Sequence, residues 1–390
     1  MNPRGRKRAL SWAVCLSYLL ICGTVFTPSS STSGASGQES FARRWRPTRV
    51  PAGVIFVGDQ ACAECHKDKV VSQSQSSMAM AMESVKDSKV LTGKMSFRDG
   101  DYSYEIKRAG DQSFYTVTDG KETISLPILY AFGQGKAGQT YVLQYDGAFY
   151  EGRVSFYQEI KGLDFTIGQP RATPATLREA LGRRLSRVET LNCFNCHATG
   201  AVSGGQLHPD KLTLGVRCEA CHGPGGDHIA ANKAGRPGAG LIFNPAQLSG
   251  DELTQDFCAS CHRGNEEFAL LKSLEVNNVR FQPYRMFHSK CYSDDRRISC
   301  TACHDPHEPL KVAAAYYDAK CLKCHQSDKN VAGGKTAQAA ASDKPSEKGC
   351  RVGTRNCASC HMPKVEPPGA HFKFTDHYIR IVKPNEAYKN

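Results

Sequence analysis

The sequence predicts a mainly α-helical fold with extensive loops and one small β module, in which something other than side chains fills much of the interior. Only 40% of the 390 residues are hydrophobic and 9% are aromatic, whereas 35 glycines and 19 prolines favour loops. The 18 cysteines recur mostly in one short pattern. One long stretch without cysteine or histidine alternates apolar and polar residues, as short strands do.

The short pattern is Cys-x-x-Cys-His, and it occurs seven times. Two thiols one helical turn apart can add to the two vinyl groups of one haem, and the histidine that follows can then bind the iron. The cysteines of the first to the seventh motif, in chain order, are Cys62, Cys65, Cys193, Cys196, Cys218, Cys221, Cys258, Cys261, Cys300, Cys303, Cys321, Cys324, Cys357 and Cys360. The motif histidines are His66, His197, His222, His262, His304, His325 and His361. The sequence therefore predicts seven covalently bound haem c groups.

Zinc sites and a disulfide framework are the competing interpretations of these cysteines. A zinc ribbon needs paired Cys-x-x-Cys knuckles but no histidine directly after each one, and a disulfide framework leaves the identical spacing unexplained. Outside the motifs, Cys15 and Cys22 lie in the N-terminal segment. Cys291 and Cys350 are expected to form a disulfide in an oxidising compartment, the alternative being two separately buried thiols.

A six-coordinate haem needs a second axial ligand, usually histidine or methionine. The six histidines outside the motifs, close to one per haem, are His208, His228, His288, His307, His371 and His377. His307 in "CHDPH" and His228 in "CHGPGGDH" follow a motif too closely to reach their own iron, so each is expected to bind a neighbouring one. The pair in "HFKFTDH" is expected to bind as well. The other two lie in polar loops, where a solvated histidine is equally expected.

Six spare histidines leave one of the seven haems without a second ligand, and Met78 is the candidate for it. Met78 is the first of three methionines in the run "SSMAMAM", and their helical spacing suits core packing equally well. As a thioether ligand it would serve the first haem.

The chain divides into four expected parts. Residues 1–37 are expected to be a signal peptide or N-terminal anchor, because four basic residues precede an apolar run and then a Ser/Gly stretch. The others are a first haem segment at 55–90, a haem-free β module at 91–170, and a six-haem domain at 171–390 with a flexible insert at about 326–349. Whether this segment is a signal peptide or an anchor, the rest of the chain is expected in the periplasm or otherwise outside the cytoplasm.

The motif segments resemble the cytochrome c-554-like multihaem proteins, also called the cytochrome c-552/4 family. The resemblance covers "FVGDQACAECHKDKVVSQSQSSMAMAM", "CFNCHATG", "CEACHGPGGDH", "CTACHDPHEPL" and "CASCHMPKV…HFKFTDH" in that order. It implies periplasmic electron transfer through closely packed haems. That family often places a distal histidine in a Ser-x-His-Ala setting, where this chain has Met78, so the resemblance favours Met78 as a ligand of the first haem.

Two functional classes follow from these features. The first is an electron carrier between redox proteins, such as a quinol-oxidising membrane complex or periplasmic cytochromes. It is favoured because the histidines outside the motifs nearly suffice to give every haem a second ligand. The alternative is a multihaem oxidoreductase acting on a small nitrogen or sulfur compound at one five-coordinate haem. The formal charge of +12 suits haem propionates as counter-charges, and no basic run with interleaved aromatics indicates nucleic acid. Membrane contact is expected only through the possible N-terminal anchor.

Overall fold

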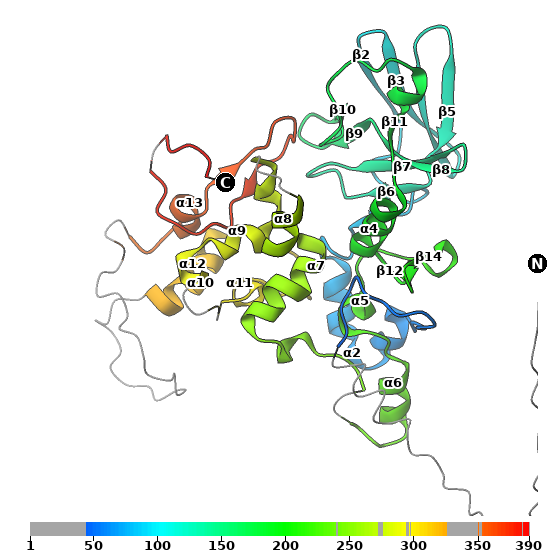
Figure 1. Ribbon diagram of the computed structural model, residues 1–390. Coiled ribbons are helices and arrows are strands. Elements are labelled where there is room, and N and C mark those ends of the chain that lie inside the picture. Colours follow the sequence, from blue (N-terminus) through cyan, green and yellow to red (C-terminus); the bar gives the residue numbers. More distant parts are fainter. Residues whose placement is uncertain are drawn as a thin grey trace, which may run out of the picture.

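The computed structural model describes residues 44–238, 241–271, 276–293, 296, 298–325, 350, 353–383 and 385–389. The expected signal or anchor segment (1–37) and the expected insert (326–349) lie outside these residues. Figure 1 shows a β-sheet region beside a larger region of short helices and loops. No helix within the described ranges is both long and apolar enough to cross a membrane.

The β region contains a four-stranded antiparallel meander in the order β2-β3-β4-β5. Its strands are β2 (Lys94–Asp99), β3 (Tyr102–Ala109), β4 (Gln112–Thr118) and β5 (Thr123–Pro127). Alternate side chains of β3 and β4 are buried, because successive residues of a strand point to opposite faces of the sheet. The β3–β4 turn places Gly110 at a φ of 61°, a conformation that glycine adopts without steric cost.

A five-stranded sheet joins this meander to the helical region. Its order is β1-β6-β7-β8-β11, and β9 and β10 form a separate hairpin. The bounds are β1 (Met82–Glu83), β6 (Tyr130–Phe132), β7 (Thr140–Tyr145), β8 (Ala148–Gly152), β9 (Val154–Tyr157), β10 (Gly162–Phe165) and β11 (Gly182–Arg184). Strand β1 follows the first motif and β11 precedes the second, so this sheet extends beyond residues 91–170 on both sides.

Each motif lies on a short helix. The motif helices are α2 (Asp59–Ser74), α4 (Arg187–His197), α5 (Cys218–His222), the π-helix η3 (Glu252–Cys258) with α7 (Ala259–His262), α11 (Cys300–Cys303), α12 (Ala314–His325) and α13 (Cys357–His361). A capping box fixes the start of α4, where Ser186 and Glu189 bond each other's backbone amides. Most of these helices end at the motif histidine or one residue before it, and α2 has non-helical φ and ψ at His66. The motif thus places two thiols on the last helical turn and the imidazole at its end.

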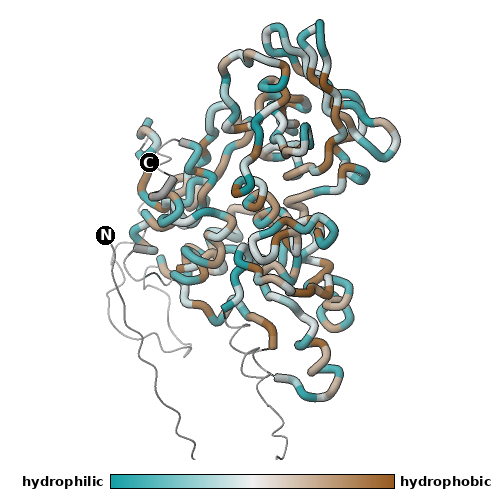
Figure 2. The backbone as a smooth tube through the Cα atoms, turned by 45° about the vertical axis from the view of Figure 1, so that its right-hand side comes forward, coloured by the Kyte–Doolittle hydropathy of each residue, from teal (hydrophilic) through white to brown (hydrophobic). Residues whose placement is uncertain are grey.

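The remaining elements are short. The helices are α3 (Leu177–Leu181), α6 (Gly226–Lys233), α8 (Asn265–Leu271), α9 (Gln282–Phe287), α10 (Lys290–Ser293), η1 (Pro209–Lys211), η2 (Pro245–Gln247) and η4 (Val276–Arg280). The strands are β12 (Ala198–Thr199), β13 (Val202–Ser203), β14 (Gln206–Leu207), β15 (Thr213–Leu214), β16 (Lys364–Val365) and β17 (Phe374–Thr375). Apolar and polar stretches alternate along the chain in both regions (Figure 2).

The side-chain core is unevenly distributed. The largest cluster of buried apolar residues lies in the β region, and a second cluster around Phe132 and Phe194 lies where that region meets α4. Among the described residues from 298 onward, Ala370 is the only fully buried hydrophobic one, although this part holds three motifs. The described helices pack there with almost no apolar side-chain core, which fits the expectation that a group other than side chains fills part of this interior.

Candidate haem sites

Three motif histidines face a second imidazole. The ring of His66 lies 6.4 Å from that of His228, the ring of His222 lies 5.9 Å from that of His307, and the ring of His304 lies 6.3 Å from that of His377. The first two pairs are nearly parallel, at 19°. For comparison, two rings in direct stacking contact lie much closer: those of Phe268 and Tyr284, inclined at 20°, have centres 3.7 Å apart.

The wider spacing of the imidazole pairs matches a shared metal ion. A metal bound to two imidazole nitrogens at about 2 Å from each places the ring centres roughly 6 Å apart. The partners come from distant parts of the chain: His228 from α6, and the other two from the loops after the fifth and seventh motifs. These residues therefore fit a haem iron held between two histidines.

Hydrogen bonds at Nδ1 orient several of the rings. In His197, His222 and His361 the Nδ1 atom donates to a backbone carbonyl, those of Ala81, Phe243 and Arg380, at 2.9, 2.9 and 3.0 Å. His377 Nδ1 donates to Thr375 O at 3.0 Å, and His307 Nδ1 lies 3.1 Å from the Asp305 carboxylate. A metal-binding histidine commonly donates its other N–H in this way. The bonds leave Nε2 of these five rings for a metal.

The pKa values of several of these imidazoles favour the neutral form that binds metals. Burial lowers the pKa of His197, His222, His262 and His304. Burial also lowers the pKa of His377 to about 4, despite its bond to the Thr375 carbonyl. These rings therefore offer a nitrogen lone pair at neutral pH.

The structure places the other candidate ligands differently. His371 directs Nε2 to the Asp164 carboxylate at 2.6 Å, and His208 directs Nε2 to Ser203 O at 3.4 Å. His288 packs against the aromatic rings of Tyr284 and Tyr378. Met78 is half-buried, and the ring that faces His66 belongs to His228. The structure thus brings three of the six non-motif histidines opposite a motif histidine.

The structure does not test the predicted disulfide between the two cysteines outside the motifs, Cys291 and Cys350. Cys291 is half-buried and close to Cys303 of the fifth motif, whereas Cys350 is exposed. Residues on both sides of Cys350 lie outside the described ranges. The disulfide between Cys291 and Cys350 stays a prediction.

Glu219, inside the third motif, is a site residue that the sequence gave no reason to single out. Its carboxylate is only 2% exposed and accepts hydrogen bonds from the amides of Val57, Gly58 and Gly225 at 2.9, 2.8 and 2.9 Å. These bonds tie the segment before α2 to α5, and so hold the first motif against the third.

Glu219→Ala is expected to lower the free energy of unfolding by about 3 kcal/mol or more, because three amides lose a charged acceptor. The measurement is denaturant unfolding of the haem-loaded protein. Glu64→Ala is the matched control, since Glu64 lies inside the first motif but is 54% exposed and pairs only with Lys233. Equal losses in both variants would contradict the role of Glu219.

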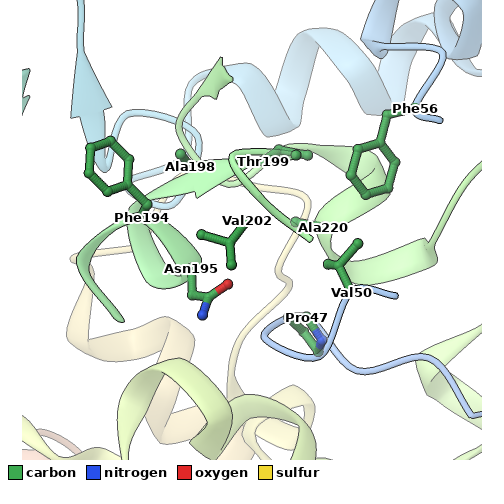
Figure 3. A pocket seen from close by; sticks show the side chains of 10 residues that line it. Pro47, Val50, Phe56, Phe194, Asn195, Ala198, Thr199, Val202 and Ala220 are labelled. Carbon is green, nitrogen blue, oxygen red and sulfur yellow. The ribbon is translucent and has the colours of Figure 1, made fainter. Parts of the chain in front are cut away.

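A small cavity lies beneath the second motif (Figure 3). Its volume is about 10 Å³, and its lining includes Phe194 and Asn195 of α4 with Val50 and Phe56 of the N-terminal segment. A space of this size holds one water molecule at most. A larger hollow of about 610 Å³ lies over the outer face of the β2–β4 strands and is lined by no motif residue. Neither cavity is a substrate pocket beside a motif.

Comparison with known proteins agrees with the motifs. A family model described as cytochrome c554 and c-prime matches residues 170–223, which include the second and third motifs. The multiheme cytochrome MtrA of Shewanella baltica (strain OS185) is 25% identical over 207 residues, which are 50% of this chain and 50% of that protein. The chain therefore spans about half the length of the curated relative it matches.

Among solved structures, the outer cell wall cytochrome OcwA resembles this chain with a TM-score of 0.42 and 17% identity, over 84% of this chain and 80% of that one. The sequence matches support a multihaem c-type cytochrome with covalently bound haem c.

Proposed function

We propose that this protein is an exported cytochrome with seven covalent haem c groups that transfers electrons between redox partners outside the cytoplasm. The observation that carries the proposal is the set of three imidazole pairs with ring centres 5.9 to 6.4 Å apart. A bound haem supplies reversible one-electron chemistry at iron, with a potential that its axial ligands tune.

The chain's own residues then have defined roles. In each motif the two thiols would anchor a haem and the histidine would bind its iron. His228, His307 and His377 would hold the same irons as His66, His222 and His304. His208, His288 and His371 stay candidates for the second, fourth, sixth and seventh motifs, and Met78 stays the alternative to His228 at the first. Binding through Nε2 would require His371 to release Asp164.

Export is supported by the sequence. The first 37 residues have the charged, apolar and small-residue order of a signal peptide. The partners proposed are other redox proteins, either a quinol-oxidising membrane complex or periplasmic cytochromes. This class of partner is proposed from the redox chemistry of haem and from the proposed extracytoplasmic location.

One observation favours a second candidate function. Among the described residues, the rings of His197, His262, His325 and His361 have no second imidazole stacked opposite them at the spacing of the three pairs. A five-coordinate iron at one of these motifs would bind a small nitrogen or sulfur compound. Carbon monoxide binding by the reduced wild-type protein distinguishes the candidates, because a carrier with six-coordinate irons binds none.

The stoichiometry of haem is the direct test of the proposal. Protein made in a host with c-type maturation is expected to carry seven covalent haems by intact mass, because every motif keeps both thiols and its histidine. Replacing both cysteines of one motif by alanine should remove one haem. A wild-type protein with fewer than six haems would contradict the assignment of the motifs.

A further inference from the structure

The first and third motifs are direct neighbours in space. Helix α2 packs against α5, and the thiols of Cys62 and Cys218 lie close to each other. Asp59 at the start of α2 accepts from the Cys218 amide at 3.4 Å. Because each thiol would be bonded to the edge of its haem, these contacts would bring two haem edges together.

The fourth motif has three neighbours. Helix α7 packs against α4, the Cys196 and Cys261 thiols lie close together, and Cys196 Sγ lies 3.8 Å from Ser260 O. This connects the fourth motif to the second. On its other side η3 packs against α11, and Cys258 lies close to Cys300 of the fifth motif. Cys221 of the third motif and Cys258 of the fourth pack against the same apolar cluster around Phe243 and Phe257.

The last three motifs follow one another. Helix α11 packs against α12, and Cys303 of the fifth motif lies close to Cys321 of the sixth. Helix α12 packs against α13, and Cys321 lies close to Cys357 of the seventh. In addition, Asp318 of α12 accepts from the amides of Asn356 and Cys357, both at 2.8 Å.

We propose that the fourth motif is a branch point from which three arms of haem sites extend. One arm is the third and first motifs, another is the fifth, sixth and seventh motifs, and the last is the second motif alone. The proposal rests on the proposed electron-transfer function, and it assigns a through path from the first to the seventh motif that bypasses the second.

The arms end in different surroundings. Cys65 and His66 at the first motif and Cys360 at the seventh are exposed, as a contact with a redox partner requires. The second motif instead ends against the five-stranded sheet, where Phe194 and Cys193 pack with Phe132 of β6. The exposed arms are therefore the two ends that exchange electrons with partners, and the second motif is a side arm beneath the β region.

The test counts the haem sites that one end can reach. A ruthenium–bipyridine photosensitiser is attached to full-length, haem-loaded protein at Lys67→Cys, an exposed position directly after His66 on α2. Repeated flashes deliver electrons at the first motif, and absorbance counts the haems that become reduced. Protein without the added cysteine is labelled in parallel as the control for the other thiols. Intact mass establishes the haem number beforehand.

Two haem-deletion variants are compared. Without the second haem (Cys193→Ala with Cys196→Ala), all six remaining haems are expected to be reduced. Without the fourth haem (Cys258→Ala with Cys261→Ala), only the first and third are expected to be reduced, a loss of four of the six. The branch is overturned if loss of the second haem confines the electrons to the first, as a path in sequence order requires.

An unmodified protein gives an independent readout. Iron positions from anomalous scattering should place the fourth iron beside those of the second, third and fifth motifs, and fewer than three such neighbours would also overturn the branch. This measurement remains valid where a deletion variant fails to fold. Seven haems by mass of which none accepts electrons from the label would instead overturn the proposed function, and the branch with it.

Discussion

Replacing His228, His307 or His377 by alanine is expected to open one additional iron to carbon monoxide in each variant. The imidazoles of these residues face those of His66, His222 and His304 at the spacing of a shared metal ion. Removing one leaves a five-coordinate iron, which binds carbon monoxide when reduced. A titration of the reduced protein, followed by absorbance, should count one more bound molecule than wild type in each single variant and three more in the triple variant.

Two control substitutions make this result specific. His371→Ala removes a histidine whose Nε2 is held by Asp164; as long as Asp164 holds that nitrogen, the carbon monoxide count should stay unchanged, and an increase would assign His371 to an iron instead. Met78→Leu should also leave the count unchanged, because His228 lies opposite His66. If Met78→Leu opens an iron and His228→Ala does not, the thioether is the ligand of the first haem and the paired histidines are a packing contact.

The sequence predicted the motif chemistry because each motif is local. Two thiols and an imidazole within five residues need only one helical turn to meet a single haem, and the comparisons confirm the coarser prediction of a multihaem c-type cytochrome. The pairing of axial ligands is not local. His307 follows the fifth motif but lies opposite His222 of the third, and no pattern near either residue specifies that contact.

The segment "HFKFTDH" illustrates the same limit. Its two histidines were equivalent candidates, six positions apart in one polar stretch. The fold distinguishes them through residues far away in the sequence: His371 meets Asp164 of the β region, whereas His377 faces His304. Buried charges are equally hard to predict, because arginine and aspartate are usually exposed. Only the structure shows that Glu219, Arg285 and Asp376 are buried.

The arrangement of the motifs is also non-local. The second motif precedes the third in the chain, yet the third contacts the first, and both the second and the third contact the fourth. Strands β1 and β11 explain part of this non-sequential arrangement. Strand β1 pairs with β6 and β11 pairs with β8, so the second motif, which follows β11, lies against the sheet.

Asp376→Asn is expected to be among the most destabilising single substitutions, lowering the free energy of unfolding by about 3–5 kcal/mol. Asp376 and Arg285 are both fully buried and form two parallel hydrogen bonds, at 2.8 and 2.9 Å. Losing the carboxylate leaves the guanidinium buried without its counter-charge. The surface pair of Lys94 with Glu105 is the matched control, and Glu105→Gln should cost about 1 kcal/mol or less.

The same substitution should disturb two haem sites. Asp376 precedes His377, and its second oxygen also accepts from Arg380 at 2.8 Å. The Arg380 carbonyl in turn accepts from His361 Nδ1. One short segment therefore orients an imidazole at the fifth motif and another at the seventh. Asp376→Asn should increase carbon monoxide binding by the reduced protein, whereas Glu105→Gln should not.

The carboxylate also sets a pH dependence. Burial by itself raises the pKa of Asp376, but Arg285, the Tyr378 amide and Arg380 together outweigh burial and hold the pKa below its ordinary value. A carboxylate with a lowered pKa stabilises the fold at pH values above its unfolded pKa of about 3.9. That contribution is lost as the pH falls toward the folded pKa. Wild-type stability should therefore decline more steeply below about pH 4 than that of Asp376→Asn, and parallel acid profiles for the two proteins would show that the buried pair contributes no linked stability.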